Sequence, residues 1–328
     1  MTAIVGTLNR KGIAFAADSA ATLTLSDKSK ISNNANKLFA LSKKYPVGIA
    51  LYNNLDFHGI PWEIIIKMYR NNYLKDRSFL QLSEYIEDFW SYIKSEILPK
   101  VEPSQESHVS FMASNLESEI LSLSNKNLED RGEAVDEAKQ FAEMDAILKG
   151  LVLDFSKHER AQGYEDYMYD DFVAYSEKLI ETEISALLGN AFCPADFKDT
   201  FAKALFWIMM SKQEVYFNYS GLVFWGYGEE DLFPSCYDYH ITLAFDKRMK
   251  TVEQAAYHVS NDSHAWIVPF AQTDVANTVV GGIDHTLRKA IYKGIEGAFD
   301  DFRNNIIAEL NKAGAPKDLS DALTNFVS

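Results

Sequence analysis

Residues 2–19 read TAIVGTLNRKGIAFAADS, and this stretch decides the predicted fold. Residues 2–8 are rich in β-branched side chains, which favour strands. Residues 9–12 (NRKG) are a turn signal, and residues 13–18 have the composition of a returning strand. The stretch therefore predicts an N-terminal hairpin in which the first residues of the chain belong to a sheet.

The pattern outside this hairpin alternates between strands and helices. Residues 37–41 and 47–52 predict a second strand pair. Apolar residues then recur at helical spacing, and helices are expected at 60–73, 79–97, 116–128, 133–155, 167–188, 195–210 and 279–310, with a short amphipathic segment at 318–328. Further strands are expected at 215–219, 222–228, 237–245 and 266–270. This order predicts an α+β fold with a pair of sheets between helical layers.

The composition bounds the class of protein. The 328 residues are 47% hydrophobic, which is enough for the core of one large domain or two small ones. A formal net charge of -15 argues against non-specific binding to nucleic acid or to anionic membranes. The two cysteines, Cys193 and Cys236, are interpreted as reduced thiols. With no signal-peptide pattern and only short apolar runs, the protein is expected to be soluble and cytoplasmic.

Three residues near the start of the chain have side chains suited to act together. Methionine aminopeptidase removes Met before small residues, so Thr2 is expected to carry a free α-amine. A hydroxyl and its own α-amine form a nucleophile–base pair, because that amine has a reference pKa of about 7.7–8.0. Asp18 ends the returning strand and needs a charged partner if it is buried. Lys37 begins the next apolar strand, where it could pair with Asp18 and lower the pKa of the Thr2 hydroxyl.

Together these residues resemble the proteasome β-subunit family of N-terminal-nucleophile hydrolases. In that family an N-terminal Thr begins the first strand, an Ala-Ala-Asp-Ser segment ends the second, and a Lys begins the third; Thr2, residues 16–19 and Lys37 match these places. Residues 222–230 look like the family's strand after its helix pair, and residues 279–284 like the start of the next helix. The long helical stretch is similar to a divergent, bacterial-type branch of the family.

The resemblance implies a single N-terminal-nucleophile-hydrolase domain over 1–328. The implied fold is a four-layer αββα sandwich with a helical insertion at about 100–212, apparently lacking the family's C-terminal strand hairpin. Thr2, Asp18 and Lys37 are the implied catalytic residues. A main-chain N–H of Tyr52 or Asn53, in place of the family's Gly-Gly turn, would receive the oxyanion.

Two further residues are implied to support the site. Ser19 follows the catalytic Asp18 in the matching segment, and the family's supporting Ser aligns near Gln272 or Thr273. The implied activity is threonine-type hydrolysis of a peptide or protein, without a cofactor. The alternative is a catalytically impaired member that acts as an assembly scaffold or partner-binding module. Both imply a homo-oligomer, and neither identifies an ATPase partner.

Other constellations in the sequence do not favour a different chemistry. The seven His residues lack metal-ligand spacing, so no metal site is expected. The acidic residues at 165–166, 170–171 and 229–231 are interpreted as solvated faces. No Gly-rich phosphate loop occurs in the sequence. Cys236 is expected to be a packing residue, not a nucleophile.

Overall fold

The computed structural model describes residues 3–19, 21–25, 28–32, 36–188, 195–214 and 218–314. The chain is a mixed α+β protein, as predicted, with antiparallel sheets. It divides into two compact units, residues 1–271 and 272–328, and each is described by itself. The single-domain interpretation stays a prediction.

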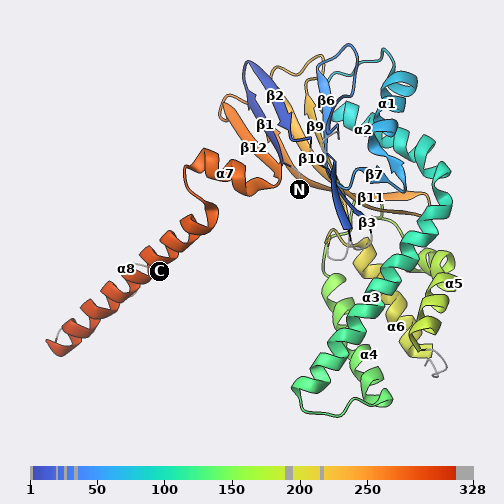
Figure 1. Ribbon diagram of the computed structural model, residues 1–328, viewed down its shortest axis with the longest axis vertical. Helices are drawn as coiled ribbons and strands as arrows, with labels where there is room; N and C mark the ends of the chain where they lie inside the picture. The colour runs from blue at the N-terminus through green and yellow to red at the C-terminus, as the bar shows by residue number, and fades with distance from the viewer. Residues whose placement is uncertain are drawn as a thin grey trace. The chain divides into compact units, whose positions relative to one another are not determined.

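The predicted N-terminal hairpin is present and belongs to a three-stranded sheet (Figure 1). β1 (Ala3–Asn9) runs between β2 (Gly12–Ala17) and β12 (Ala265–Ala271). The ring of Phe15 lies directly over Gly6, where an added Cβ would be 2.6 Å from the ring. Glycine at this position therefore lets the hairpin pack an aromatic side chain against its own backbone.

A five-stranded sheet in the order β11-β10-β9-β6-β5 packs against the first sheet. Tyr52 and Ala50 on its inner face contact the same apolar cluster as Ile4 and Phe270 of the three-stranded sheet. β6 is buried on both faces, which explains its near-continuous apolar sequence. The strands are β5 (Leu38–Ala40), β6 (Val47–Asn53), β9 (Ser220–Gly226), β10 (Ser235–Phe245) and β11 (Arg248–His258).

Two helices cover the outer face of the five-stranded sheet. They are α1 (Trp62–Met68) and α2 (Leu82–Tyr92). Each continues into a π-helical turn, at 69–74 and 93–97, and a 3₁₀ turn follows at 98–100. Phe89 and Trp90 of α2 stack edge-on against Phe224 of β9, with ring centroids 5.5 and 5.2 Å apart. Unit 1 thus contains three layers in order: the three-stranded sheet, the five-stranded sheet, and the helices α1 and α2.

The segment at about 100–212 forms four helices with a core of their own. They are α3 (Glu102–Asp130), α4 (Glu137–Phe155), α5 (Tyr169–Leu188) and α6 (Ala195–Met210). α3 begins at Glu102, so the prediction of a start at 116 was wrong. Its first turns are mostly polar and bury only a narrow apolar stripe, including Val109 and Met112, which is a weak periodic signal.

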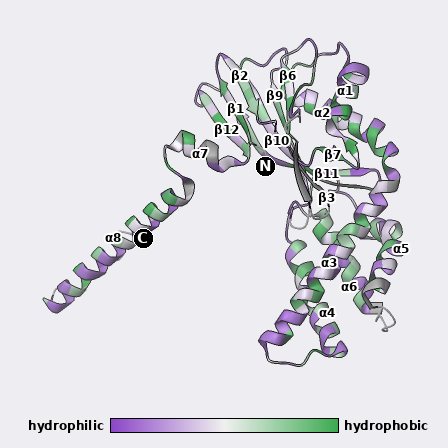
Figure 2. Cartoon of the chain, viewed as in Figure 1, coloured by the Kyte–Doolittle hydropathy of each residue, from purple (hydrophilic) through white to green (hydrophobic). Residues whose placement is uncertain are grey.

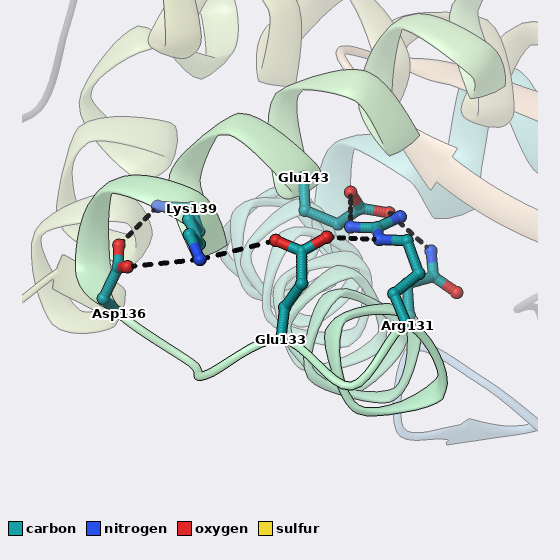
Figure 3. Close-up of polar contacts among 6 residues, drawn as sticks. Arg131, Glu133, Asp136, Lys139 and Glu143 are labelled. Carbon is teal, nitrogen blue, oxygen red and sulfur yellow. Dashed lines mark hydrogen bonds and ion pairs between the residues drawn. The ribbon is translucent and has the colours of Figure 1, made fainter.

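The turn between α3 and α4 is hydrophilic and carries an ion network (Figures 2 and 3). Arg131 pairs with Glu133 at 3.0 Å and with Glu143 at 2.7 Å. Lys139 lies 3.5 Å from Glu133, and Asp136 caps α4 by accepting from the Lys139 N–H at 2.9 Å. Apart from Glu143, which is 17% exposed, these side chains are 40% or more exposed, so solvent screens the pairs and each contributes little to stability.

Several strand and helix predictions were wrong in detail. β11 was not predicted, because its turn from β10 uses Asp246 and Lys247 at positive φ instead of the usual Asn-Gly signal. Small hairpins at β3 (Ala21–Leu25) with β4 (Lys28–Ser32), and at β7 (Asp56–Phe57) with β8 (Ile60–Pro61), were also missed. Asn218 and Tyr219 precede β9 and are not strand residues, while 215–217 lie outside the described part.

The second unit contains α7 (Thr273–Gly281) and α8 (His285–Lys312). The single helix predicted at 279–310 was wrong, because Gly282 at φ +69 ends α7 and Asp284 caps the start of α8. The predicted segment at 318–328 and the expected absence of a C-terminal hairpin concern residues outside the described ranges. Among the described helices, none combines the length and apolar character that crossing a membrane requires.

Candidate active site

Asp18 and Lys37 form an ion pair that joins the two sheets. Asp18 directly follows β2, and its Oδ1 accepts hydrogen bonds from the Lys37 ammonium at 2.8 Å and from the Ala3 N–H at 2.9 Å. The Asp18 N–H donates in turn to the Ala3 carbonyl at 3.0 Å. The pairing predicted from the sequence is therefore confirmed, and the carboxylate is fixed to the first residue of β1.

The Lys37 side chain is fully buried, with 0% exposed, whereas Asp18 is 35% exposed. The Lys37 main chain is held as well, since its carbonyl accepts from the Leu51 N–H of β6 at 2.8 Å. Burying an ammonium costs several kcal/mol unless an anion and further hydrogen bonds compensate it. The geometry therefore presents a fixed positive charge beside the start of β1.

The structure locates the other predicted site residues, Thr2, Ser19 and Thr273, to different extents. Thr2 immediately precedes Ala3 in the chain but lies outside the described residues. Ser19 is exposed directly after Asp18. Thr273 opens α7 and belongs to the second compact unit, so it is described only with that unit.

The two predicted oxyanion donors, Tyr52 and Asn53, are not equivalent. Successive N–H groups of a strand point to opposite sides. Because the Leu51 N–H donates to the Lys37 carbonyl, the Asn53 N–H is expected on that same side and the Tyr52 N–H on the side of β9. Asn53 has φ +63, and its side-chain amide donates to the Tyr219 carbonyl at 2.9 Å. Asn53 is therefore the better candidate for a main-chain donor near Lys37.

The Tyr52 side chain belongs to a buried polar network that the sequence interpretation missed. Its hydroxyl lies 2.9 Å from both carboxylate oxygens of Asp238 and 2.7 Å from Nε2 of His240. The other ring nitrogen of His240 lies 2.7 Å from Glu214, which also accepts from Gln254 at 3.3 Å. The only sequence signal was two polar residues two positions apart on the inner face of apolar β10.

The contacts of this network require one more proton than two carboxylates, a neutral imidazole and a phenol together carry. The three contacts Glu214–His240, His240–Tyr52 and Tyr52–Asp238 need one proton each. A neutral imidazole and a phenol supply two. The third must lie on one of the two carboxyls, Asp238 or Glu214, or on the imidazole of His240. Each of these arrangements leaves the network with a net charge of −1.

Burial shifts the pKa of several groups here. Desolvation raises the pKa of Asp238 to about 6, although its hydrogen bond from Tyr52 opposes this. Desolvation, reinforced by Asp238, raises the pKa of Tyr52. Lys250, buried nearby with its ammonium 3.0 Å from the Gln213 carbonyl, has a pKa lowered by desolvation to about 7. Burial also raises the pKa of the Cys236 thiol, as expected for a packing residue and not a nucleophile.

A cavity of about 240 Å³ lies where the β7–β8 hairpin meets α3 and the ends of β9 and β10. His58 and His108 line it, and burial lowers both imidazole pKa values, that of His108 to about 4. Within the described ranges, no three His, Cys, Asp or Glu side chains group together as a metal site.

No protein-family model, curated protein or solved structure matches this chain. Any assignment of function therefore depends on the residues themselves and on the sequence resemblance.

Proposed function

We propose that this protein is a proteasome-like threonine hydrolase of peptides or proteins, with Thr2 as its nucleophile after removal of Met1. The proposal includes the four-layer αββα sandwich of the N-terminal-nucleophile hydrolases. The observation that supports it is the shared Oδ1 of Asp18, which binds both the buried Lys37 ammonium and the N–H of the residue after Thr2. A carboxylate and a cation fixed beside the start of a strand are what an N-terminal nucleophile requires.

The proposed reaction proceeds in two steps. The Thr2 hydroxyl attacks an amide carbonyl, its proton passes to the α-amine through a water, and the C–N bond breaks as the leaving amine takes that proton. Water then attacks the ester on Thr2 and releases the acid. The Lys37 charge stabilises the developing alkoxide, Asp18 positions Lys37, and the Asn53 N–H is the proposed oxyanion donor.

The decisive experiment measures the mature N-terminus and the reactivity of Thr2 together. Intact mass should show loss of Met1, and an epoxyketone or β-lactone probe should label Thr2. Thr2→Ala should abolish labelling and the hydrolysis of a fluorogenic peptide panel, whereas Thr7→Ala, which replaces an exposed threonine of β1, should leave both unchanged. Retained Met1, or hydrolysis that persists in Thr2→Ala, contradicts the proposal.

Lys37→Met and Asp18→Asn should each lower hydrolysis while the Thr2 α-amine stays free. A protein with a free Thr2 amine but no labelling and no hydrolysis would favour the alternative of a scaffold or partner-binding module. Self-association is part of both proposals, and light scattering that returns a strict monomer contradicts it.

A further inference from the structure

The cavity between the β7–β8 hairpin and α3 brings together two histidines that are 50 positions apart in sequence. His58 lies in the hairpin turn and His108 on α3, and both line the cavity with Thr242 of β10. Neither Asp18 nor Lys37 lines this space, so it is separate from the proposed nucleophile site. His58 has φ +52, a backbone conformation that costs a non-glycine residue free energy.

The Ser104 hydroxyl contacts one ring nitrogen of His58 and is compatible with a metal-binding tautomer. The Ser104 hydroxyl has one proton and donates it to the Val101 carbonyl at 2.8 Å. Its oxygen lies 3.0 Å from Nδ1 of His58 and can accept a hydrogen bond from Nδ1–H. In that tautomer a neutral His58 ring has an unprotonated Nε2. This is the arrangement in which a metal-binding histidine is commonly held, with one nitrogen donating to a neighbouring oxygen and the other free to coordinate.

The second ring is placed at a distance that suits a shared ligand. The ring centroids of His58 and His108 lie 5.2 Å apart with an interplanar angle of 72°. Two imidazoles that bind one tetrahedral Zn²⁺ at 2.0–2.1 Å have centroids about 5 Å apart. Among the residues described, neither ring nitrogen of His108 has a hydrogen-bond partner in the protein. The candidate ligand atoms are therefore a ring nitrogen of His108 and Nε2 of His58 in the tautomer described above.

The walls of the cavity are compatible with a cation. The described residues that line it include no Lys or Arg, and the Asp56 carboxylate, which accepts from the Gly59 N–H at 3.2 Å, lies in the wall without forming a three-residue ligand group with the histidines. The Thr242 hydroxyl is buried, with the residue 3% exposed, and has no hydrogen-bond partner within the described protein. A buried hydroxyl without a partner costs free energy, which a metal-bound water could recover.

We propose that His58 and His108 bind a divalent transition metal ion such as Zn²⁺, with water in the remaining coordination positions. Since no third His, Cys, Asp or Glu completes the set within the described ranges, the site is open and its metal exchangeable. The ion would connect the β7–β8 hairpin of the sheet region to α3, the first helix of the segment at 102–210. Metal binding should therefore raise the thermal stability of the protein.

The test uses untagged, chelator-treated full-length protein and metal ions alone. Calorimetry with Zn²⁺ should show one site per chain, and electron paramagnetic resonance with Cu²⁺ should show coupling to two nitrogens. His58→Ala and His108→Ala should each lower Zn²⁺ affinity by at least about 10–100-fold and reduce the copper signal to one nitrogen. Ser104→Ala, which removes the acceptor that orients His58, should lower affinity by roughly 10-fold.

His158→Ala is the matched control, because this histidine follows α4 and does not line the cavity. His108→Gln keeps a side chain of similar size and checks that loss of binding is not loss of folding, which circular dichroism measures directly. Absence of Zn²⁺ binding at millimolar concentration, or wild-type affinity in His58→Ala and His108→Ala, overturns the proposal.

Discussion

Replacing Asp238 by Asn should remove a pH-dependent cost from the free energy of unfolding. Burial raises the pKa of this carboxyl from 3.8 to about 6. The folded state then binds an extra proton between about pH 4 and pH 6, so the free energy of unfolding falls as pH rises through that window. At about 1.4 kcal/mol per pKa unit, the cost at neutral pH is about 3 kcal/mol. Below about pH 3 the carboxyl is protonated in both states and contributes nothing.

Asparagine suits the network because it cannot ionise and still supplies the third proton. Its amide can donate to the Tyr52 oxygen, which frees the Tyr52 hydroxyl to donate to His240. Urea unfolding of the wild type and Asp238→Asn should be measured at pH 4, 5, 6 and 7. The stability of the variant relative to the wild type should increase by about 2.5 kcal/mol from pH 4 to pH 7. Asp154→Asn, an exposed control, should show no such change. A difference that is independent of pH would refute the argument.

Three other substitutions test the packing and charge assignments. Lys250, whose pKa falls from 10.5 to about 7, should make the free energy of unfolding rise between pH 7 and pH 10, and Lys250→Met should abolish this rise in urea unfolding. Phe89→Ala should cost about 3–5 kcal/mol by the same measurement, since the ring is fully buried against Phe224. Gly226→Ala should cost about 1–3 kcal/mol, because φ is +136 and the new Cβ would lie 2.0 Å from the Pro46 carbonyl; Gly12→Ala, with nothing within 4 Å, should change little.

The sequence alone was sufficient to predict those features that depend on residues close together in the chain. The turn at 9–12 between two strands of β-branched and small residues predicted the hairpin, and its register places Asp18 beside Ala3. The pairing of Asp18 with Lys37 could be predicted because a half-buried carboxylate needs a cation and the next strand begins with one. The four helices at 102–210 were recognised because each has an apolar face of its own.

Contacts between distant strands could not be predicted in this way. Tyr52 meets His240 across 188 positions, and nothing near either residue specifies the other. His58 and His108 meet only because a left-handed turn orients one ring toward α3. β11 escaped prediction because positive φ at Asp246 and Lys247 is a property of the folded turn, not of a preferred turn sequence.

Several buried polar and charged groups of the first unit lie near one end of the five-stranded sheet. The Lys37 carbonyl accepts from the Leu51 N–H of β6. The residue after Leu51, Tyr52, lies opposite Gly221 of β9, which in turn lies opposite His240 of β10. With strands about 4.8 Å apart, the Lys37 end of β5 and the His240 position of β10 are about 14 Å apart. Buried charges and titrating groups reduce stability, and proteins retain such costs chiefly at functional or strained sites. The buried Lys37 ammonium and the Tyr52–Asp238–His240 network therefore make the β6–β9–β10 end the first place to test by substitution.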